Sequence, residues 1–341
     1  MKKKPTLSYN KILILLAVSL LAAMIGSVTL GRYPIGLKEL GGILASRILD
    51  IEPFWTKTQE SLLLQHRLPR ILLACMVGGS LACAGAAYQG VFQNPMAAPD
   101  ILGASSGAAF GAALAILLGA SSMGITIGAF AASLLTVALV FTVSRHARGD
   151  RVLGLVLAGI MVSSLFQSGT SFLKLVADPN NQLPQITYWL MGSLSGAAWS
   201  DIGFVLLPML CGLIPLLLLR WQLNVITMGD DEARAMGVDP RKIRLWIAVA
   251  STLVTASAVS VSGMIGWVGL VIPHMMRRLV GSDYRFLMPA SMLGGGIFLL
   301  IVDNVSRNAT TAGIPIGILT AFIGAPFFLW LITGKGDHYE H

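Results

Sequence analysis

Apolar stretches of about 20 residues recur along almost the whole chain, and they constrain its fold more than any other feature. A helix needs about 20 mostly apolar residues to cross the hydrocarbon core of a bilayer. The sequence contains about ten such stretches, at roughly residues 11–31, 68–92, 100–119, 122–144, 151–175, 201–220, 243–262, 263–281, 286–304 and 314–333. We therefore predict an all-α polytopic membrane bundle that forms one transmembrane domain over residues 1–341.

The composition agrees with a chain that is surrounded mainly by lipid. Hydrophobic residues make up 55% of the sequence and charged residues 12%, and the mean hydropathy is +0.75. Soluble domains usually contain about 25% charged residues. A net charge of +8 can indicate a nucleic-acid partner. The sequence has no basic patch interleaved with aromatic residues, so we expect no nucleic acid and assign the basic residues to loops at the membrane surface.

The distribution of Lys and Arg predicts the orientation of the bundle. If the chain starts in the cytoplasm and the spans alternate, roughly two-thirds of the 24 Lys and Arg residues fall on the cytoplasmic side, as the positive-inside rule requires. The first apolar run follows Lys2, Lys3 and Lys4 and is longer than the apolar core of a typical signal peptide. We interpret it as a retained membrane helix, and we predict that both termini are cytoplasmic.

We predict no catalytic residues and no bound cofactor or metal on this chain. The Gly334-Lys335 pair lacks the glycine-rich loop and the Ser or Thr of a P-loop, so any ATP must be hydrolysed on another chain. The histidines are dispersed, and Cys75, Cys83 and Cys211 lie singly in apolar runs. That pattern is neither a disulfide framework nor a zinc site.

Two other functional classes remain open from the residues alone. Residues 103–107, Gly-Ala-Ser-Ser-Gly, match the pattern of a serine nucleophile, with His274 as the candidate base of an intramembrane hydrolase. The same glycines have an alternative interpretation. Gly103, Gly107 and Gly111 are spaced four residues apart, and small residues at this spacing allow membrane helices to pack closely. Asp303 is the one acid near the interior of a predicted span, and a buried acid is what an ion-driven secondary carrier needs.

The polar segment at about 221–244 is predicted to form two short helices between two spans. Acidic residues at 230–232 suit the positive end of a helix dipole, and Gly237 suits the left-handed position that ends a helix. Asp239 can then cap a second helix that has Pro240 in its first turn. Docking to a cytoplasmic partner and an ordinary ordered loop both remain open.

Four blocks of sequence, in this order, carry a resemblance to a known family. The first runs from Arg67-Leu68-Pro69-Arg70 through Asn94-Pro95-Met96-Ala97-Ala98-Pro99-Asp100, and the second is Trp189-Leu190-Met191-Gly192-Ser193-Leu194. The third covers residues 229–238, and the fourth runs from Gly263 to Pro326. In these blocks the chain resembles the permease family of iron-siderophore, haem and vitamin B12 ABC importers. Met264 and Trp267 depart from the family's usual proline and phenylalanine.

The resemblance implies a multi-pass permease in the cytoplasmic membrane of a bacterium or archaeon. It implies a second copy of the chain, two ABC ATPase subunits that bind ATP and Mg²⁺, and an extracytoplasmic substrate-binding protein. The substrate would be a metal chelate, with iron-siderophore first and haem or a corrinoid next, and an oxyanion such as molybdate is within the family's range. Specificity would reside mainly in the binding protein.

The resemblance also assigns residues. The segment that matches the family's coupling helix, which docks on the ATPase, consists of Gly229, Asp230, Asp231, Glu232, Ala233, Arg234, Ala235, Met236 and Gly237. The residues that match the arginines docking the binding protein are Arg67, Arg70 and Arg307. We expect the translocation pathway or its gate to include Gln89, Asn94, Arg148, Gly149 and Asp150.

Overall fold

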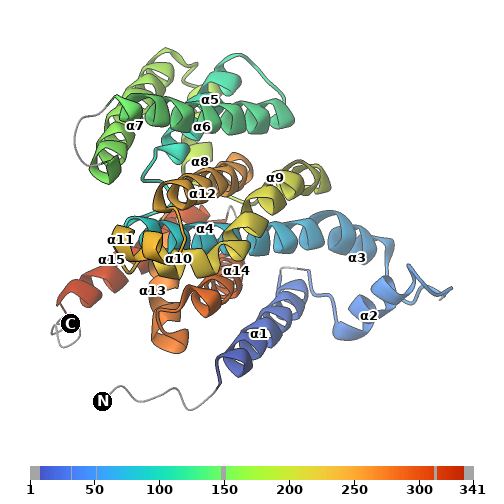
Figure 1. Cartoon of the computed structure of the whole chain (residues 1–341). Coiled ribbons are helices and arrows are strands. Elements are labelled where there is room, and N and C mark those ends of the chain that lie inside the picture. Colours follow the sequence, from blue (N-terminus) through green and yellow to red (C-terminus); the bar gives the residue numbers. More distant parts are fainter. Residues whose placement is uncertain (1–7, 32, 51, 147–150, 311–312, 334–341) are drawn as a thin grey trace.

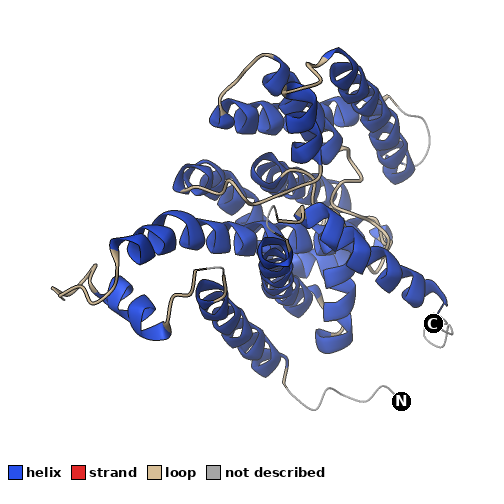
Figure 2. Cartoon of the chain, turned by 180° about the vertical axis from the view of Figure 1, so that it is seen from behind, coloured by secondary structure: helices blue, strands red, loops and turns tan. Residues whose placement is uncertain are grey.

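The chain folds into a bundle of helices, described here from a computed structural model over residues 8–31, 33–50, 52–146, 151–310 and 313–333. No strand occurs in these ranges (Figure 2). The long helices are α1 (Tyr9–Thr29), α4 (Leu68–Val91), α5 (Ala104–Leu117), α6 (Ser122–Arg145), α7 (Arg151–Val176), α9 (Trp199–Leu218), α12 (Pro240–Ser262), α13 (Val268–Val280), α14 (Tyr284–Ala309) and α15 (Ile316–Thr333). They correspond in order to the ten predicted stretches, so the predicted all-α membrane bundle is confirmed.

Not every one of these helices is long enough to cross a bilayer alone. Among the described residues, seven helices have the length and hydropathy of a membrane span, and α5 and α15 are shorter apolar helices. The predicted span at 263–281 is wrong in its bounds, because α13 has only 13 residues and begins at Val268. Residues between α12 and α13 leave the helical conformation at Gly263, with φ of 66°, and at Trp267, with φ of 70°.

Short helices lie at the two ends of the bundle. One end carries α2 (Leu37–Ala45), α3 (Lys57–Ser61) and a π-helical turn (Leu62–Arg67) that leads into α4. The other end carries α10 (Arg220–Ile226) and α11 (Asp230–Ala235). Figure 1 shows α11 on the opposite side of the molecule from α2 and α3. We call these two ends the α3 end and the α11 end. A further short helix, α8 (Gln182–Leu190), precedes α9.

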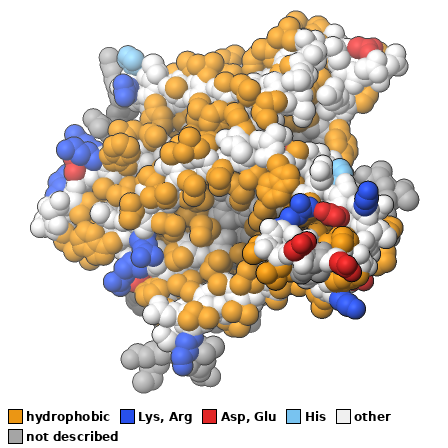
Figure 3. Space-filling view, turned by 90° about the vertical axis from the view of Figure 1, so that its right-hand side faces the viewer, with side chains coloured by type: hydrophobic (Ala, Val, Ile, Leu, Met, Phe, Trp, Pro, Cys, Tyr) orange, Lys and Arg blue, Asp and Glu red, His pale blue; other side chains and the backbone are white. Residues whose placement is uncertain are grey.

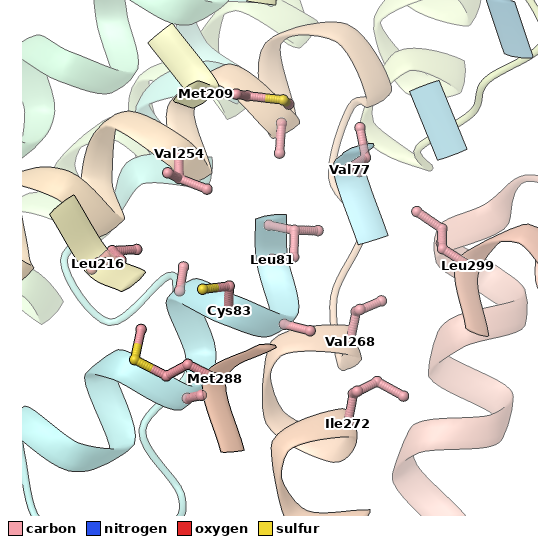
Figure 4. Close-up of a cluster of buried hydrophobic side chains, with 14 of the residues drawn as sticks. Val77, Leu81, Cys83, Met209, Leu216, Val254, Val268, Ile272, Met288 and Leu299 are labelled. Atoms are coloured by element: carbon pink, nitrogen blue, oxygen red, sulfur yellow. The ribbon is translucent and has the colours of Figure 1, made fainter. Parts of the chain in front are cut away.

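Helix α4 forms the centre of the bundle, and small residues let its neighbours approach closely. A Cβ atom on Gly78 would lie 2.2 Å from the carbonyl oxygen of Gly295 in α14, and one on Gly85 would lie 1.8 Å from that of Gly269 in α13. Only glycine permits such backbone contact between membrane helices. Around α4, side chains from α9, α12, α13 and α14 fill the core (Figure 4).

The surface of the bundle is as apolar as the sequence predicts for a chain in lipid. Only 17% of the apolar window of α1 is buried, against 83% for the span that contains α4. Figure 3 views the molecule from the α3 end, where hydrophobic side chains cover much of the face and charged ones gather in small groups. Exposed apolar area of this extent is expected where lipid or another subunit replaces water.

Candidate functional site

The loop between α9 and α12 confirms part of the prediction for residues 221–244. The first predicted short helix is α11, at Asp230–Ala235. The second is not a separate short helix, because the segment that begins at Pro240 continues for 23 residues as α12. The sequence interpretation missed α10, which follows α9 almost without interruption because only Leu219 separates them.

The local signals that define α11 act as the sequence suggests. Gly229 precedes the helix with φ of 134° and Gly237 follows it with φ of 77°, two conformations that favour glycine. Asp230, Asp231 and Glu232 occupy the first turn. Asp239 then accepts hydrogen bonds from the backbone N–H groups of residues 241 and 242, which caps α12.

Helix α11 presents one buried and one exposed face. Ala233 is fully buried, and Val238 just beyond the helix is also buried. The exposed side chains are Asp231, Glu232, Arg234, Ala235 and Met236. This exposed face is polar, as the rim of a protein interface is, and it carries Arg234 and Met236, two residue types that interfaces favour.

An ion pair joins α11 to the first turns of α12. The Arg244 guanidinium donates two hydrogen bonds to the Asp230 carboxylate, at 3.0 Å and 2.5 Å. Hydrogen bonding to Arg244 holds the pKa of Asp230 below its usual value. This two-pronged contact fixes orientation as well as distance between the two helices.

The three arginines predicted to dock a binding protein line one cavity of about 360 Å³ at the α3 end. Arg67 and Arg70 come from the junction of the π-helical turn with α4, and Arg307 comes from the end of α14. Residues that are 240 positions apart in sequence therefore meet in one place, and their role in docking stays a prediction.

The protein itself holds all three side chains, which the sequence did not predict. Arg67 is only 6% exposed and donates to the carbonyl oxygens of Val28 and Tyr33. Arg307 contacts the backbone carbonyl of Ser27 and the side chain of Asn304. These partners carry no formal charge. Arg67 is buried and Arg307 is half-buried, so of the two only Arg307 can be reached directly from outside.

Arg70 has an acidic partner, Asp303. Its guanidinium donates hydrogen bonds of 2.8, 2.9 and 3.1 Å to the carboxylate, which has no exposed surface. Asp303 is the residue on which the ion-driven carrier hypothesis depended. Protonation of this carboxylate would break the ion pair and leave the Arg70 charge without its partner. The contact therefore favours a structural role for Asp303 over a role as a proton relay.

The serine hydrolase hypothesis finds no support in the geometry. Ser105 lies in the first turn of a helix in a protein whose described parts contain no strand, and its backbone N–H donates to Asp100 at 2.6 Å. His274 lies on α13, where its ring faces Phe327. The glycines serve packing instead, since a Cβ atom on Gly111 would lie 2.2 Å from a backbone oxygen of α6.

The predicted pathway residues fall in different environments. Gln89 is buried inside the protomer, where its amide donates to the carbonyls of Gly269 and Leu270 at 3.4 Å. Asn94 lies in an exposed turn after α4 and accepts a hydrogen bond from the N–H of Met96. Arg148, Gly149 and Asp150 lie outside the described residues. Their role in a gate stays a prediction.

Comparison with known proteins gives the wider context of this geometry. Residues 15–334 match the FecCD transport family. The chain belongs to this family. It is 41% identical to the molybdate import system permease protein MolB of Haemophilus influenzae over 94% of its own length and 95% of that protein. It is 45% identical to the cobalamin import system permease protein BtuC of Halobacterium salinarum over 79% of its own length and 72% of that protein.

A solved structure agrees with the sequence comparison. It is described as an inward-facing conformation of a metal-chelate type ABC transporter. This chain superimposes on it with a TM-score of 0.84 and 40% sequence identity, over 95% of this chain and 99% of that one. The chain is thus a permease subunit of an ABC importer of the metal-chelate class, and it is a multi-pass membrane protein. Its relatives are permease subunits of ABC importers, which are transporters and not enzymes, and the ATPase of such importers is a separate partner.

Proposed function

We propose that two copies of this chain form the membrane channel of a binding-protein-dependent importer that carries a metal chelate into the cytoplasm. The observation that carries the proposal is the full-length family match, together with the separation of the two candidate docking sites. Helix α11 lies at the opposite end of the bundle from α3 (Figure 1). The arginine-lined cavity adjoins the π-helical turn that follows α3.

The α11 end would face the ATPase. Its exposed residues at 231, 232 and 234–236 would sit on the ATPase surface, and its buried face would bind it to the rest of the permease. ATP binding closes two ATPases onto each other, and any helix that is docked on them moves with them. The pathway would then open alternately to the two sides, because ATP binds more tightly in one conformation than in the other.

The α3 end would face the binding protein. The cavity holds three guanidinium groups and, on Arg70, one carboxylate partner. An acidic side chain of the binding protein would meet Arg307, which is half-buried and whose hydrogen-bond partners Ser27 and Asn304 carry no formal charge. Arg67 is buried beneath this position and would act on the acid only at a distance. Such pairs orient docking and raise the association rate more than they add affinity.

For the substrate we propose an iron-siderophore, haem or corrinoid complex, because relatives across this family are named for chelated metals. A second candidate is molybdate, and one specific observation favours it. The full-length relative that is 41% identical over 94% of this chain is a molybdate permease. The small apolar residues of α4 are buried inside the protomer, so they do not distinguish these cargoes.

The test starts with purification of the tagged protein from its native membranes in mild detergent, followed by mass spectrometry. A P-loop ATPase in equal amount is the expected partner, and a co-purifying binding protein can be titrated with ferric siderophore, haem, cobalamin and molybdate. Uptake of the tightest ligand into proteoliposomes should require ATP. A dimer that purifies alone and transports in response to an ion gradient would refute the proposal.

A further inference from the structure

Helix α10, which the sequence interpretation missed, contacts α4, α9, α11, α12 and α14. Its Asn224 side chain donates to the Asp283 carboxylate at 2.7 Å and accepts from the backbone N–H of Tyr284 at 2.8 Å. Asp283 is the N-cap of α14 and Tyr284 is its first residue. One amide group therefore fastens α10 to the beginning of α14.

The same short helix is fastened to the central helix. The Gln93 side chain, just beyond α4, donates to the carbonyl oxygen of Ile226 at the end of α10, at 3.0 Å. Leu223 of α10 is fully buried, and a Cβ atom on Gly90 of α4 would lie only 2.8 Å from it. A contact this close transmits displacement, because packed interiors have little free volume.

Helix α11 is joined to α10 directly by the chain, because only residues 227–229 separate the two helices. A second connection from α11 runs through the Asp230–Arg244 ion pair to α12. Arg244 lies one turn into a helix of 23 residues, which spans roughly 34 Å at 1.5 Å per residue. At the far end of α12, the backbone carbonyl of Ser262 accepts a hydrogen bond of 2.8 Å from the backbone N–H of Ser193. Ser193 lies just after α8. Helix α12 therefore reaches from α11 to the segment that borders the arginine-lined cavity, since Ser193 also lines that cavity.

We propose that α10 and the Asp230–Arg244 pair form a two-part clasp that transmits the displacement of α11 to the bundle. The first part, Asn224 with Asp283 and Tyr284, moves α14. The second part, Asp230 with Arg244, moves α12. Arg244 and Asn224 would be positioning residues for coupling, because they act through the helices that they hold together. This inference rests on the proposed docking of α11 to an ATPase.

The measurement is substrate transported per ATP hydrolysed, in proteoliposomes that contain the permease, its ATPase and its binding protein. Asp230→Asn and Arg244→Met are each expected to lower this ratio about threefold to fivefold, as suits the loss of a partly exposed ion pair. Since both variants break the same contact, the double variant should be no worse than either single one. Lys242→Met is the matched control, because it removes an exposed cation from the same turn of α12 and should leave the ratio unchanged.

The first part of the clasp has its own variant. Asn224→Leu keeps the size of the side chain but removes both hydrogen bonds to α14, and it is expected to lower transport per ATP while the ATPase still co-purifies. If Arg244→Met fails to assemble, Arg244→Lys supplies the comparison, since it keeps the charge but loses the two-pronged contact. Single variants at wild-type ratio, or a double variant whose loss is the product of the two single losses, would overturn the clasp.

A further variant separates failure of the clasp from failure of the proposed docking. Glu232→Lys reverses a charge on the exposed face of α11. If it uncouples transport while Arg244→Met does not, α11 docks as proposed and the clasp is wrong. If neither variant changes the ratio or the recovery of the ATPase, α11 is not the coupling element, and both inferences fail.

Discussion

Replacement of Asp303 tests whether the buried pair with Arg70 is structural. The carboxylate has no exposed surface, and the Arg70 side chain retains 17% of its own. Removal of one partner from a buried pair costs about 3–5 kcal/mol, because the other charge is left without compensation. Water in the cavity can partly solvate Arg70, so we expect Asp303→Asn to lower the free energy of unfolding by about 2–3 kcal/mol.

The assay is urea unfolding of the purified protein in detergent, followed by tryptophan fluorescence. Glu60→Gln is the control, because it breaks the more exposed pair with Arg47 at the same end of the molecule. That change should cost less than about 1 kcal/mol. Replacement of both Arg70 and Asp303 by leucine should regain at least half of the loss, since no unpaired charge remains.

Two results would refute this reasoning. One is an Asp303→Asn protein that is as stable as the wild type, which would show that the pair contributes nothing to the fold. The other is a loss of transport in that variant with unchanged stability. An ion-driven carrier would behave in the second way, because its acid would move a proton or a cation instead of holding an arginine.

Three further predictions follow from individual contacts. Gly85→Ala should destabilise the bundle by about 1–3 kcal/mol in the same assay, because the added Cβ would meet the backbone of Gly269. Gly26→Ala is the control: the added Cβ meets nothing within 4 Å, so this change should be neutral or slightly stabilising. Arg307→Gln should slow association of the binding protein in surface plasmon resonance and reduce the salt dependence of that rate; an unchanged rate would contradict a role in docking. Hydrogen bonds from Arg285 lower the pKa of Asp283 to about 2 in the folded protein. The contribution of Asp283 to stability is therefore complete above the unfolded pKa of about 4 and is lost as the pH falls from 4 to 2. Measurement of the free energy of unfolding at graded pH tests this prediction.

Much of the fold follows from hydropathy alone. Each predicted apolar stretch corresponds to a helix, because a backbone in lipid must satisfy its own hydrogen bonds and a helix does so locally. The ends of α11 were also readable, since Gly237 and Asp239 act on the residues directly beside them. Such signals depend on neighbours in sequence, and the sequence contains those neighbours.

Long-range pairing was decided only by the tertiary structure. The predicted span at 263–281 becomes helical only at Val268. The positive φ at Trp267, just before it, depends on packing, since a Cβ atom on Gly324 would lie 2.5 Å from the tryptophan side chain. The partner of Asp303 lies 233 residues away, and that of Asn224 lies 59 residues away. Hydropathy and capping patterns report on a few residues at a time, whereas these contacts arise from the way whole helices pack against one another. The sequence by itself therefore determined a helical membrane permease and the ends of its α11 helix, and the packing of α4, α10, α12 and α14 decided which polar groups meet.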